Sequence, residues 1–289
     1  MNLVSWLRTS KSQLVRPLSS HRKHRRGRRN TRPASELLEP RTLLAAVMWD
    51  GGGGNLDWNN ASNWSTDQLP GAGDDVTIDA PGEVTIEVSS DVAIHSLQTS
   101  DALTVSSGTF SISGDSQINA QFTNAGGTVS ISGATVTGVG SFVNAAGSTV
   151  FAHASVINMA LSNDGIWEVR EQVYVNGPLT TGASSAIRIL QWDSFNSNGN
   201  AALTVSDGFV NHGLIDLSSI ARRGNNYSAL VVQNGVLTNA ADGTIRSSDP
   251  AGNGGRCSLT GSLDNRGLLD LSQYGLNWQN VRVRAPTAG

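Results

Sequence analysis

The sequence predicts an all-β chain, a single-stranded parallel β-helix (β-solenoid) preceded by a disordered basic N-terminal segment. Beyond Asp75, apolar and polar residues alternate over short runs that Gly, Pro and Ser turns separate. A unit with a fixed Asn recurs at spacings of one solenoid turn. With 32 Gly and only 15% charged residues, the chain favours stacked short strands. A β-sandwich is the alternative fold, because alternation and turns suit it as well.

Charge divides the chain into parts with different roles. Residues 1–45 contain 11 of the 20 Lys and Arg and two Glu, whereas the rest contains 9 Arg and 21 acidic residues. Because binding to a phosphate backbone depends on clustered cations, we expect no nucleic-acid binding by the acidic part. No apolar run reaches the roughly 18 to 20 residues that cross a bilayer, so we expect no transmembrane span. We divide the chain into a basic targeting segment (1–46), a Trp/Gly-rich N-terminal cap with the first strands (47–100) and a β-helix repeat region (101–285).

The N-terminal segment combines an Arg-rich run at 21–32, HRKHRRGRRNTR, with the stretch LEPRTLL. This stretch resembles the LEPR-XLL motif, found near the N-terminus of long surface or secreted bacterial proteins, and its fixed positions are Leu38, Glu39, Pro40, Arg41, Leu43 and Leu44. The resemblance covers about the first 48 residues and implies export to the cell surface or the medium. A solvated basic tail and a tail that contacts nucleic acid are the alternatives.

Residues 48–79 are rich in Trp, Gly and Asn, and Trp49, Gly51–Gly54, Trp58, Asn63 and Trp64 stand out. They resemble the opening that precedes β-helical repeats in autotransporter-like and adhesin-like bacterial proteins. Because a solenoid end exposes an apolar cross-section, we expect the three Trp to cover it. Alternatively, Trp58, Trp64 and Asn63 contact carbohydrate. We expect no structural metal, because Leu56 takes the Asp position of the calcium-binding Gly repeat.

The recurring unit is an apolar residue, any residue, Asn, a short spacer, Gly and a new strand. Its six copies contain Asn124, Asn144, Asn163, Asn211, Asn239 and Asn265. The longest interval between these Asn, 48 residues, divides into 18 and 30 if Thr181 marks a degenerate copy. We interpret the Asn as structural, forming a ladder and turning tight corners in the left-handed conformation, with the following Gly at positive φ.

Pectin-degrading β-helices place paired carboxylates to activate water and protonate the leaving oxygen. Their N-T-D, G-D-D, G-H-G and R-I-K elements have imperfect counterparts here, in the wrong order, at Ser162–Asp164, Gly73–Asp75, Asn211–Gly213 and Arg188–Leu190. Arg222 and Arg223 would serve as a lyase base but lack an acidic cluster nearby. His95 and His153 have no second ligand at metal spacing, and Cys257 has no identifiable His partner. We therefore expect no catalytic residues, cofactor or metal.

These observations predict a secreted or cell-surface structural and adhesion module that is not an enzyme and contacts polysaccharide. The alternative is a pectinase-like hydrolase or lyase. Since the final residues, APTAG, show no anchor, we expect either secretion of the whole chain or descent from a longer protein.

Overall fold

The computed structural model describes residues 46–191, 199–219, 227–248, 256–271 and 277–284. The chain separates into residues 1–41 and a compact unit of residues 42–289, and only the second contains described residues. The Arg-rich run and the LEPR-XLL positions Leu38, Glu39, Pro40, Arg41, Leu43 and Leu44 lie outside them.

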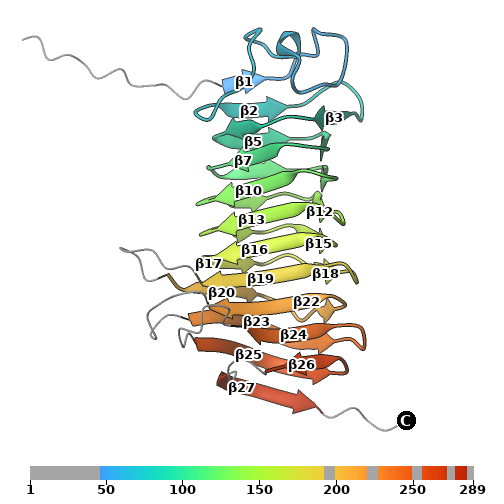
Figure 1. Cartoon of the computed structure of the whole chain (residues 1–289). Helices are drawn as coiled ribbons and strands as arrows, with labels where there is room; N and C mark the ends of the chain where they lie inside the picture. The colour runs from blue at the N-terminus through green and yellow to red at the C-terminus, as the bar shows by residue number, and fades with distance from the viewer. Residues whose placement is uncertain (1–45, 192–198, 220–226, 249–255, 272–276, 285–289) are drawn as a thin grey trace, which may run out of the picture. The chain divides into compact units, whose positions relative to one another are not determined.

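The described residues form a parallel β-helix. Over residues 75–191, each coil contributes one strand in turn to three sheets, whereas the later coils contribute to only two of them, and each strand pairs with its equivalent one coil away (Figure 1). All the strand pairs with an assigned register are parallel, for example β10 with β13 and β12 with β15. The alternative of a β-sandwich is therefore wrong, because its sheets would be antiparallel.

The strands have the following bounds. The 12-stranded sheet contains β1 (Ala46–Met48), β2 (Asp75–Ile78), β5 (Ser96–Thr99), β8 (Ser116–Ile118), β11 (Thr135–Thr137), β14 (Val156–Ile157), β17 (Gln172–Val175), β20 (Ala201–Val205), β21 (Val210–Asn211), β23 (Tyr227–Asn239), β25 (Arg256–Asn265) and β27 (Asn277–Arg284). The nine-stranded sheet contains β4 (Val92–Ile94), β7 (Thr109–Ile112), β10 (Thr128–Ser132), β13 (Thr149–His153), β16 (Ile166–Arg170), β19 (Ala186–Gln191), β22 (Leu214–Ser219), β24 (Thr244–Ser248) and β26 (Leu268–Asp270). The six-stranded sheet contains β3 (Thr85–Val88), β6 (Ala102–Val105), β9 (Gln121–Asn124), β12 (Ser141–Asn144), β15 (Ala160–Asn163) and β18 (Leu179–Thr181).

Alternation along most of the strands sends every second side chain into the interior. In the nine-stranded sheet, Val150, Trp167, Ile187 and Ile215 occupy equivalent inward positions on successive coils and are buried. Each such side chain contributes about 1.5 to 3 kcal/mol when it leaves water. Since a single coil cannot enclose these side chains, stability depends on stacking.

The six repeat Asn form two ladders inside the coils, and all of them except the partly buried Asn265 are buried. Asn124 Nδ2 donates to Asn144 Oδ1 (2.9 Å), and Asn144 Nδ2 donates to Asn163 Oδ1 (2.7 Å). The second ladder runs from Asn211 to Asn239 (2.8 Å) and on to Asn265 (2.7 Å). The predicted ladder and the predicted coil spacing are therefore confirmed.

Thr181 lies between the two ladders and takes the Asn position of the coil between Asn163 and Asn211, as predicted. It is the register partner of Asn163, and its Oγ1 donates to Val210 O (3.1 Å) and accepts from His212 N (3.0 Å). A hydroxyl thus links this coil to the following one where an amide is missing.

The prediction that these Asn adopt the left-handed conformation, each followed by a Gly at positive φ, was wrong for all six Asn and for most of the Gly. None of the six Asn has a positive φ, because each ends a strand and turns its amide inward. Of the Gly that follow them, Gly147 has a positive φ (84°). Gly127 is required by a close approach instead, since a Cβ there would lie 2.8 Å from Gly108 O and 2.7 Å from a methyl carbon of Val105.

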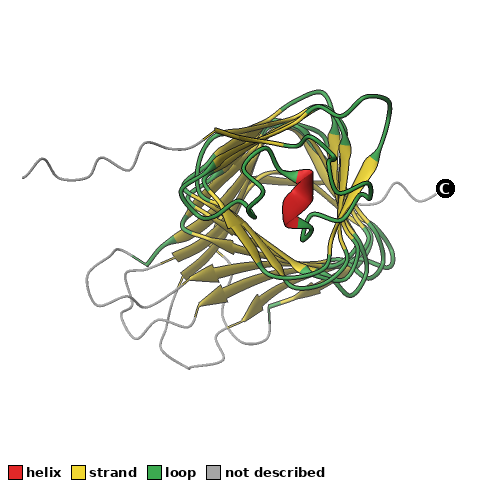
Figure 2. Ribbon diagram, turned by 90° about the horizontal axis from the view of Figure 1, so that it is seen from above, coloured by secondary structure: helices red, strands yellow, loops and turns green. Residues whose placement is uncertain are grey.

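The N-terminal end of the coils is covered by the segment between β1 and β2. Its 3-10 helix, η1 (Ala61–Asn63), lies over the interior that the sheets enclose (Figure 2). Trp64 packs edge-on against Trp58 (ring centroids 4.6 Å apart), and Trp58 packs edge-on against Phe110 (5.3 Å). The Trp-rich segment therefore forms the predicted cap and joins the core of the coils.

Candidate functional site

The residues predicted as a carbohydrate contact are inside the cap. Trp58 is 1% exposed, and Trp64 and Asn63 are 0% exposed. Trp64 Nε1 donates to Trp58 O (2.8 Å), and Asn63 Nδ2 donates to Asn55 Oδ1 (2.8 Å). The carbohydrate hypothesis is therefore wrong for these three residues, because neither indole face is open to a ligand.

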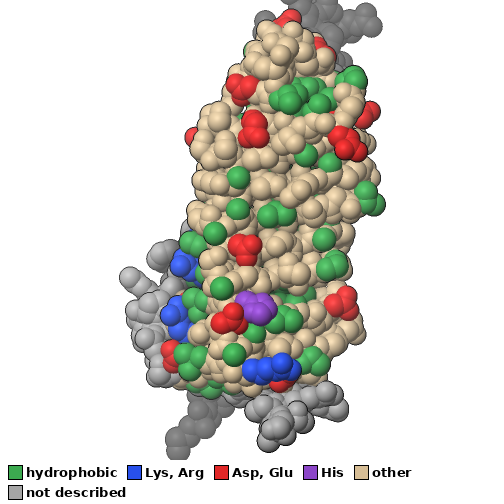
Figure 3. Space-filling view, turned by 90° about the vertical axis from the view of Figure 1, so that its right-hand side faces the viewer, with side chains coloured by type: hydrophobic (Ala, Val, Ile, Leu, Met, Phe, Trp, Pro, Cys, Tyr) green, Lys and Arg blue, Asp and Glu red, His purple; other side chains and the backbone are tan. Residues whose placement is uncertain are grey.

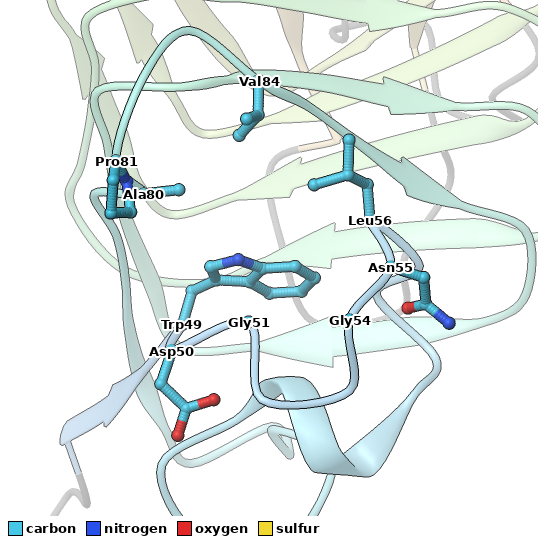
Figure 4. A pocket seen from close by; sticks show the side chains of 9 residues that line it. All are labelled: Trp49, Asp50, Gly51, Gly54, Asn55, Leu56, Ala80, Pro81 and Val84. Carbon is cyan, nitrogen blue, oxygen red and sulfur yellow. The ribbon is translucent and has the colours of Figure 1, made fainter.

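The third Trp of the cap, Trp49, borders an open pocket of about 330 Å³. Figure 4 shows its indole in the centre, with Ala80, Pro81 and Val84 on one side of the ring and Leu56 beyond its six-membered edge. Asp50, Gly51, Gly54 and Asn55 complete the lining. The pocket therefore combines an aromatic ring, aliphatic walls and backbone polar groups.

One wall of the pocket is held in place by Asn63. Its backbone carbonyl accepts hydrogen bonds from the N–H groups of Asp50 (2.9 Å) and Gly51 (3.2 Å). Its side-chain Oδ1 accepts from Gly53 N (3.0 Å). The buried Asn63 thus positions the glycine loop of the pocket.

The opposite wall is held in place by Asp101, which is also buried. Its carboxylate accepts from Ala80 N (2.6 Å) and, at a longer 3.5 Å, from Val84 N. A second pocket of about 430 Å³ lies on the other side of this wall and is lined by Glu83, Ser100, Asp101 and Asn119 among others. Both pockets are therefore built around a fixed loop.

The N-terminal coils that surround these pockets carry only negative charge. Residues 46–169 contain 13 Asp and Glu and no Lys or Arg, whereas residues 170–289 contain 8 Asp and Glu and 9 Arg. Asp50 lines the Trp49 pocket and Glu83 lines the neighbouring one. Within these described coils an anionic ligand would meet repulsion, because residues 46–169 contain no Lys or Arg that offsets these carboxylates.

Alternating charges run along the outer face of the nine-stranded sheet in the C-terminal coils. Register partners on β16, β19, β22, β24 and β26 are Glu168, Arg188, Asp216, Arg246 and Asp270. We call this column the charge ladder. Arg246 Nη2 lies 2.6 Å from Asp216 Oδ2, and this hydrogen bond holds the pKa of the guanidinium above its ordinary value. Arg188 occupies the register position between Glu168 and Asp216, where paired catalytic carboxylates would need room for water or sugar.

Each His residue of the described coils lies beside a carboxylate from another coil. His95 Nδ1 lies 2.7 Å from Asp75 Oδ1, and His212 Nδ1 lies 3.0 Å from Asp242 Oδ1. Hydrogen bonds from His95, and then from Ser96, hold the pKa of the Asp75 carboxyl below its ordinary value. Each pair joins neighbouring coils.

His153 contacts two side chains from neighbouring coils. Its Nε2 lies 3.2 Å from Glu171 Oε1, and its Nδ1 lies 3.4 Å from Ser132 Oγ. The order Ser, His, Glu is that of a nucleophile, base and orienting acid. However, the distance to Ser132 exceeds that of an ordinary hydrogen bond to a hydroxyl, and all three residues are exposed. We interpret them as surface contacts between coils.

The counterparts of the pectinase elements are not brought together. Asp75 lies in β2 of the 12-stranded sheet, Arg188 in β19 of the nine-stranded sheet, and His212 directly after β21. Arg222 and Arg223 lie outside the described residues. Cys257 is buried, and its thiol donates to Leu217 O (3.1 Å).

The part of the chain that the structure describes contains no group of three or more His, Cys, Asp or Glu placed to hold a metal ion. Among the same residues, no helix has the length and apolar character needed to cross a bilayer.

Comparison with protein-family models, curated proteins and solved structures finds no match for the chain.

Proposed function

We propose that the chain is an exported structural and adhesion module that displays a binding surface and catalyses no reaction. The observation that carries this proposal is the interior of the coils, which holds stacked apolar side chains and two Asn ladders. Neighbouring coils are joined by backbone hydrogen bonds between their strands, and these amides add side-chain hydrogen bonds between the coils that contain the repeat Asn. Such a stack favours a fixed spacing between surface groups, as a display module needs.

The outer surface supports weak, repeated contacts. Figure 3 shows a face on which side chains that are neither hydrophobic nor charged, together with backbone, make up most of the surface. Small polar side chains suit contact with hydroxyl-rich polysaccharide, and the repetition of similar coils adds avidity to weak single contacts.

The charge ladder supports a role without catalysis. In a glycoside hydrolase, two carboxylates face the scissile bond and one activates water. Here Glu168 and Asp216 are 17% and 9% exposed, and each lies beside an Arg. Carboxylates engaged in this way serve the stacking of coils.

Export is the part of the proposal that rests on the basic segment and the LEPR-XLL motif. The test is to produce the full chain in a bacterial host and to compare its cell fractions with those of a chain that lacks residues 1–45. We expect the full chain at the surface or in the medium and the shortened chain inside the cell. A control in which Arg25, Arg26, Arg28 and Arg29 become Lys keeps the charge and should still be exported. Unchanged export of the shortened chain would contradict targeting by this segment.

A further inference from the structure

We propose that the Trp49 pocket binds a single neutral pyranose residue of a polysaccharide. This inference rests on the proposed adhesion function and assigns its contact to one place. The pocket differs from the predicted Trp58 and Trp64 contact, since those indoles are enclosed while Trp49 borders open space.

The Trp49 ring is fixed before any ligand arrives. Its backbone N–H donates to Thr77 O (2.9 Å), and its ring packs at 89° against that of Trp64, with centroids 5.1 Å apart. The residue is 7% exposed, so little side-chain freedom remains to be lost on binding. A preorganised aromatic wall loses little entropy when a ligand arrives.

The indole N–H of Trp49 is a donor without a partner in the described part of the chain. Trp64 Nε1 donates to Trp58 O, but no described residue accepts from Trp49 Nε1. Figure 4 shows this nitrogen on the side of the ring that faces Ala80 and Val84, across the pocket. Because this N–H is not among the buried donors that lack a partner, it is reached from the pocket, and a ligand oxygen can accept its hydrogen bond.

The walls match the two-sided chemistry of a sugar ring. A pyranose presents C–H groups on its faces and hydroxyl groups at its rim. Val84 and Leu56 offer apolar contact, and Leu56 is 42% exposed. Figure 3 shows hydrophobic side chains gathered near the N-terminal end of one face. At about 330 Å³, the pocket lies at the lower end of the roughly 300 to 1,000 Å³ of small-molecule sites, which suits one ring.

Charge selects against acidic sugars. Asp50 lines the pocket, Glu83 lies just beyond its wall, and residues 46–169 provide no Lys or Arg to pair with a carboxylate. A uronic acid would therefore be repelled, whereas a neutral hexose or an N-acetylated hexosamine would not. The expected ligand class is the opposite of the polyuronate that pectinases bind.

The test follows the Trp49 indole signal by NMR in the full-length chain, with the Trp side chains labelled with ¹⁵N. Trp49→Phe identifies the signal by removing it. Cellohexaose and chitohexaose are titrated as neutral probes, and hexagalacturonate is titrated as the acidic probe. We expect one or both neutral probes to shift the Trp49 signal and hexagalacturonate to leave it unchanged.

Two leucines provide matched variants. Leu56→Ala removes a pocket wall and should weaken binding of the neutral probe about 3- to 10-fold. Leu69→Ala truncates a leucine of similar exposure (48%) that does not line the pocket, and should leave the affinity unchanged. Trp49→Phe removes the indole donor but keeps an aromatic ring, and should weaken binding about 3- to 10-fold when measured by calorimetry.

Several outcomes would overturn the inference. They are an unmoved Trp49 signal with both neutral probes, a larger shift of the Trp49 signal with hexagalacturonate than with either neutral probe, or equal losses for Leu56→Ala and Leu69→Ala. None of these would remove the proposed exported module, because that proposal also covers polysaccharide contact elsewhere. Cleavage of a probe during the titration would contradict the non-catalytic role instead.

Discussion

Replacement of Asn144 by Ala tests whether the buried ladder stabilises the coils. Asn144 is 0% exposed, accepts from Asn124 Nδ2 (2.9 Å), and donates to Asn163 Oδ1 (2.7 Å) and Ile166 O (3.0 Å). Asn124 Nδ2 would keep its second acceptor, Thr149 O, but Asn163 Oδ1 would lose its donor. Since each buried polar group left without a partner costs about 1 to 3 kcal/mol, we expect a loss of about 3 kcal/mol.

Asn176 provides the matched control on the outer surface. Its amide donates to Asn158 Oδ1 over 2.7 Å, like the Asn144 amide, but Asn176 is exposed. Water can replace this bond, so Asn176→Ala should cost less than about 1 kcal/mol. Thermal unfolding followed by circular dichroism measures both variants. At about 2 to 4 °C per kcal/mol, Asn144→Ala should lower Tm by roughly 10 °C. Equal losses for the two variants would refute the reasoning.

Four further predictions follow from individual contacts. Asp216→Ala should destabilise the chain more than Asp264→Ala in urea unfolding, because Asp216 is the more buried carboxylate and its loss removes the hydrogen bond to Arg246; equal losses would argue against a structural role for the charge ladder. The pKa of Asp75 is lowered in the folded chain, so this carboxylate contributes stability above its unfolded pKa of about 3.9, and that stability is lost as the pH falls through the lower folded pKa. Asp75→Asn should therefore reduce the slope of the unfolding free energy with pH in this acidic range. The Cys257 thiol should react with a colorimetric thiol reagent only after unfolding, and rapid reaction of the native chain would contradict its burial. A fluorophosphonate probe should leave Ser132 unlabelled by mass spectrometry, whereas specific labelling would favour a nucleophile.

Coil spacing could be read from the sequence because one polar residue marks each coil. The distance from Asn124 to Asn144 equals the register offset between β9 and β12, and Thr181 takes the Asn position in its own coil. The same spacing would have located the pairs that the sequence interpretation missed. His153 and Glu171 are 18 residues apart. This is also the separation of Asn163 and Thr181, which are register partners on neighbouring coils.

The Trp49 pocket could not be predicted, because Trp49, Trp58 and Trp64 all lie in one segment that is rich in Gly and Asn. Which indole meets open space depends on η1 and on the Ala80–Val84 loop, and the latter is held by Asp101 from a later coil. The role of the repeat Gly was missed for a similar reason. A recurring Gly looks the same in the sequence whether it is required by a positive φ or by close contact with the backbone of the neighbouring coil, and the sequence analysis assumed a positive φ.

The most direct test of the proposed function is a combined binding and turnover assay with the purified full chain. Neutral and acidic polysaccharides are immobilised, and both retention of the chain and release of reducing ends or unsaturated products are measured. A non-catalytic adhesion module predicts retention on at least one polysaccharide without new products. Release of oligosaccharide in proportion to the amount of protein would contradict the account and restore the alternative of a polysaccharide-acting enzyme.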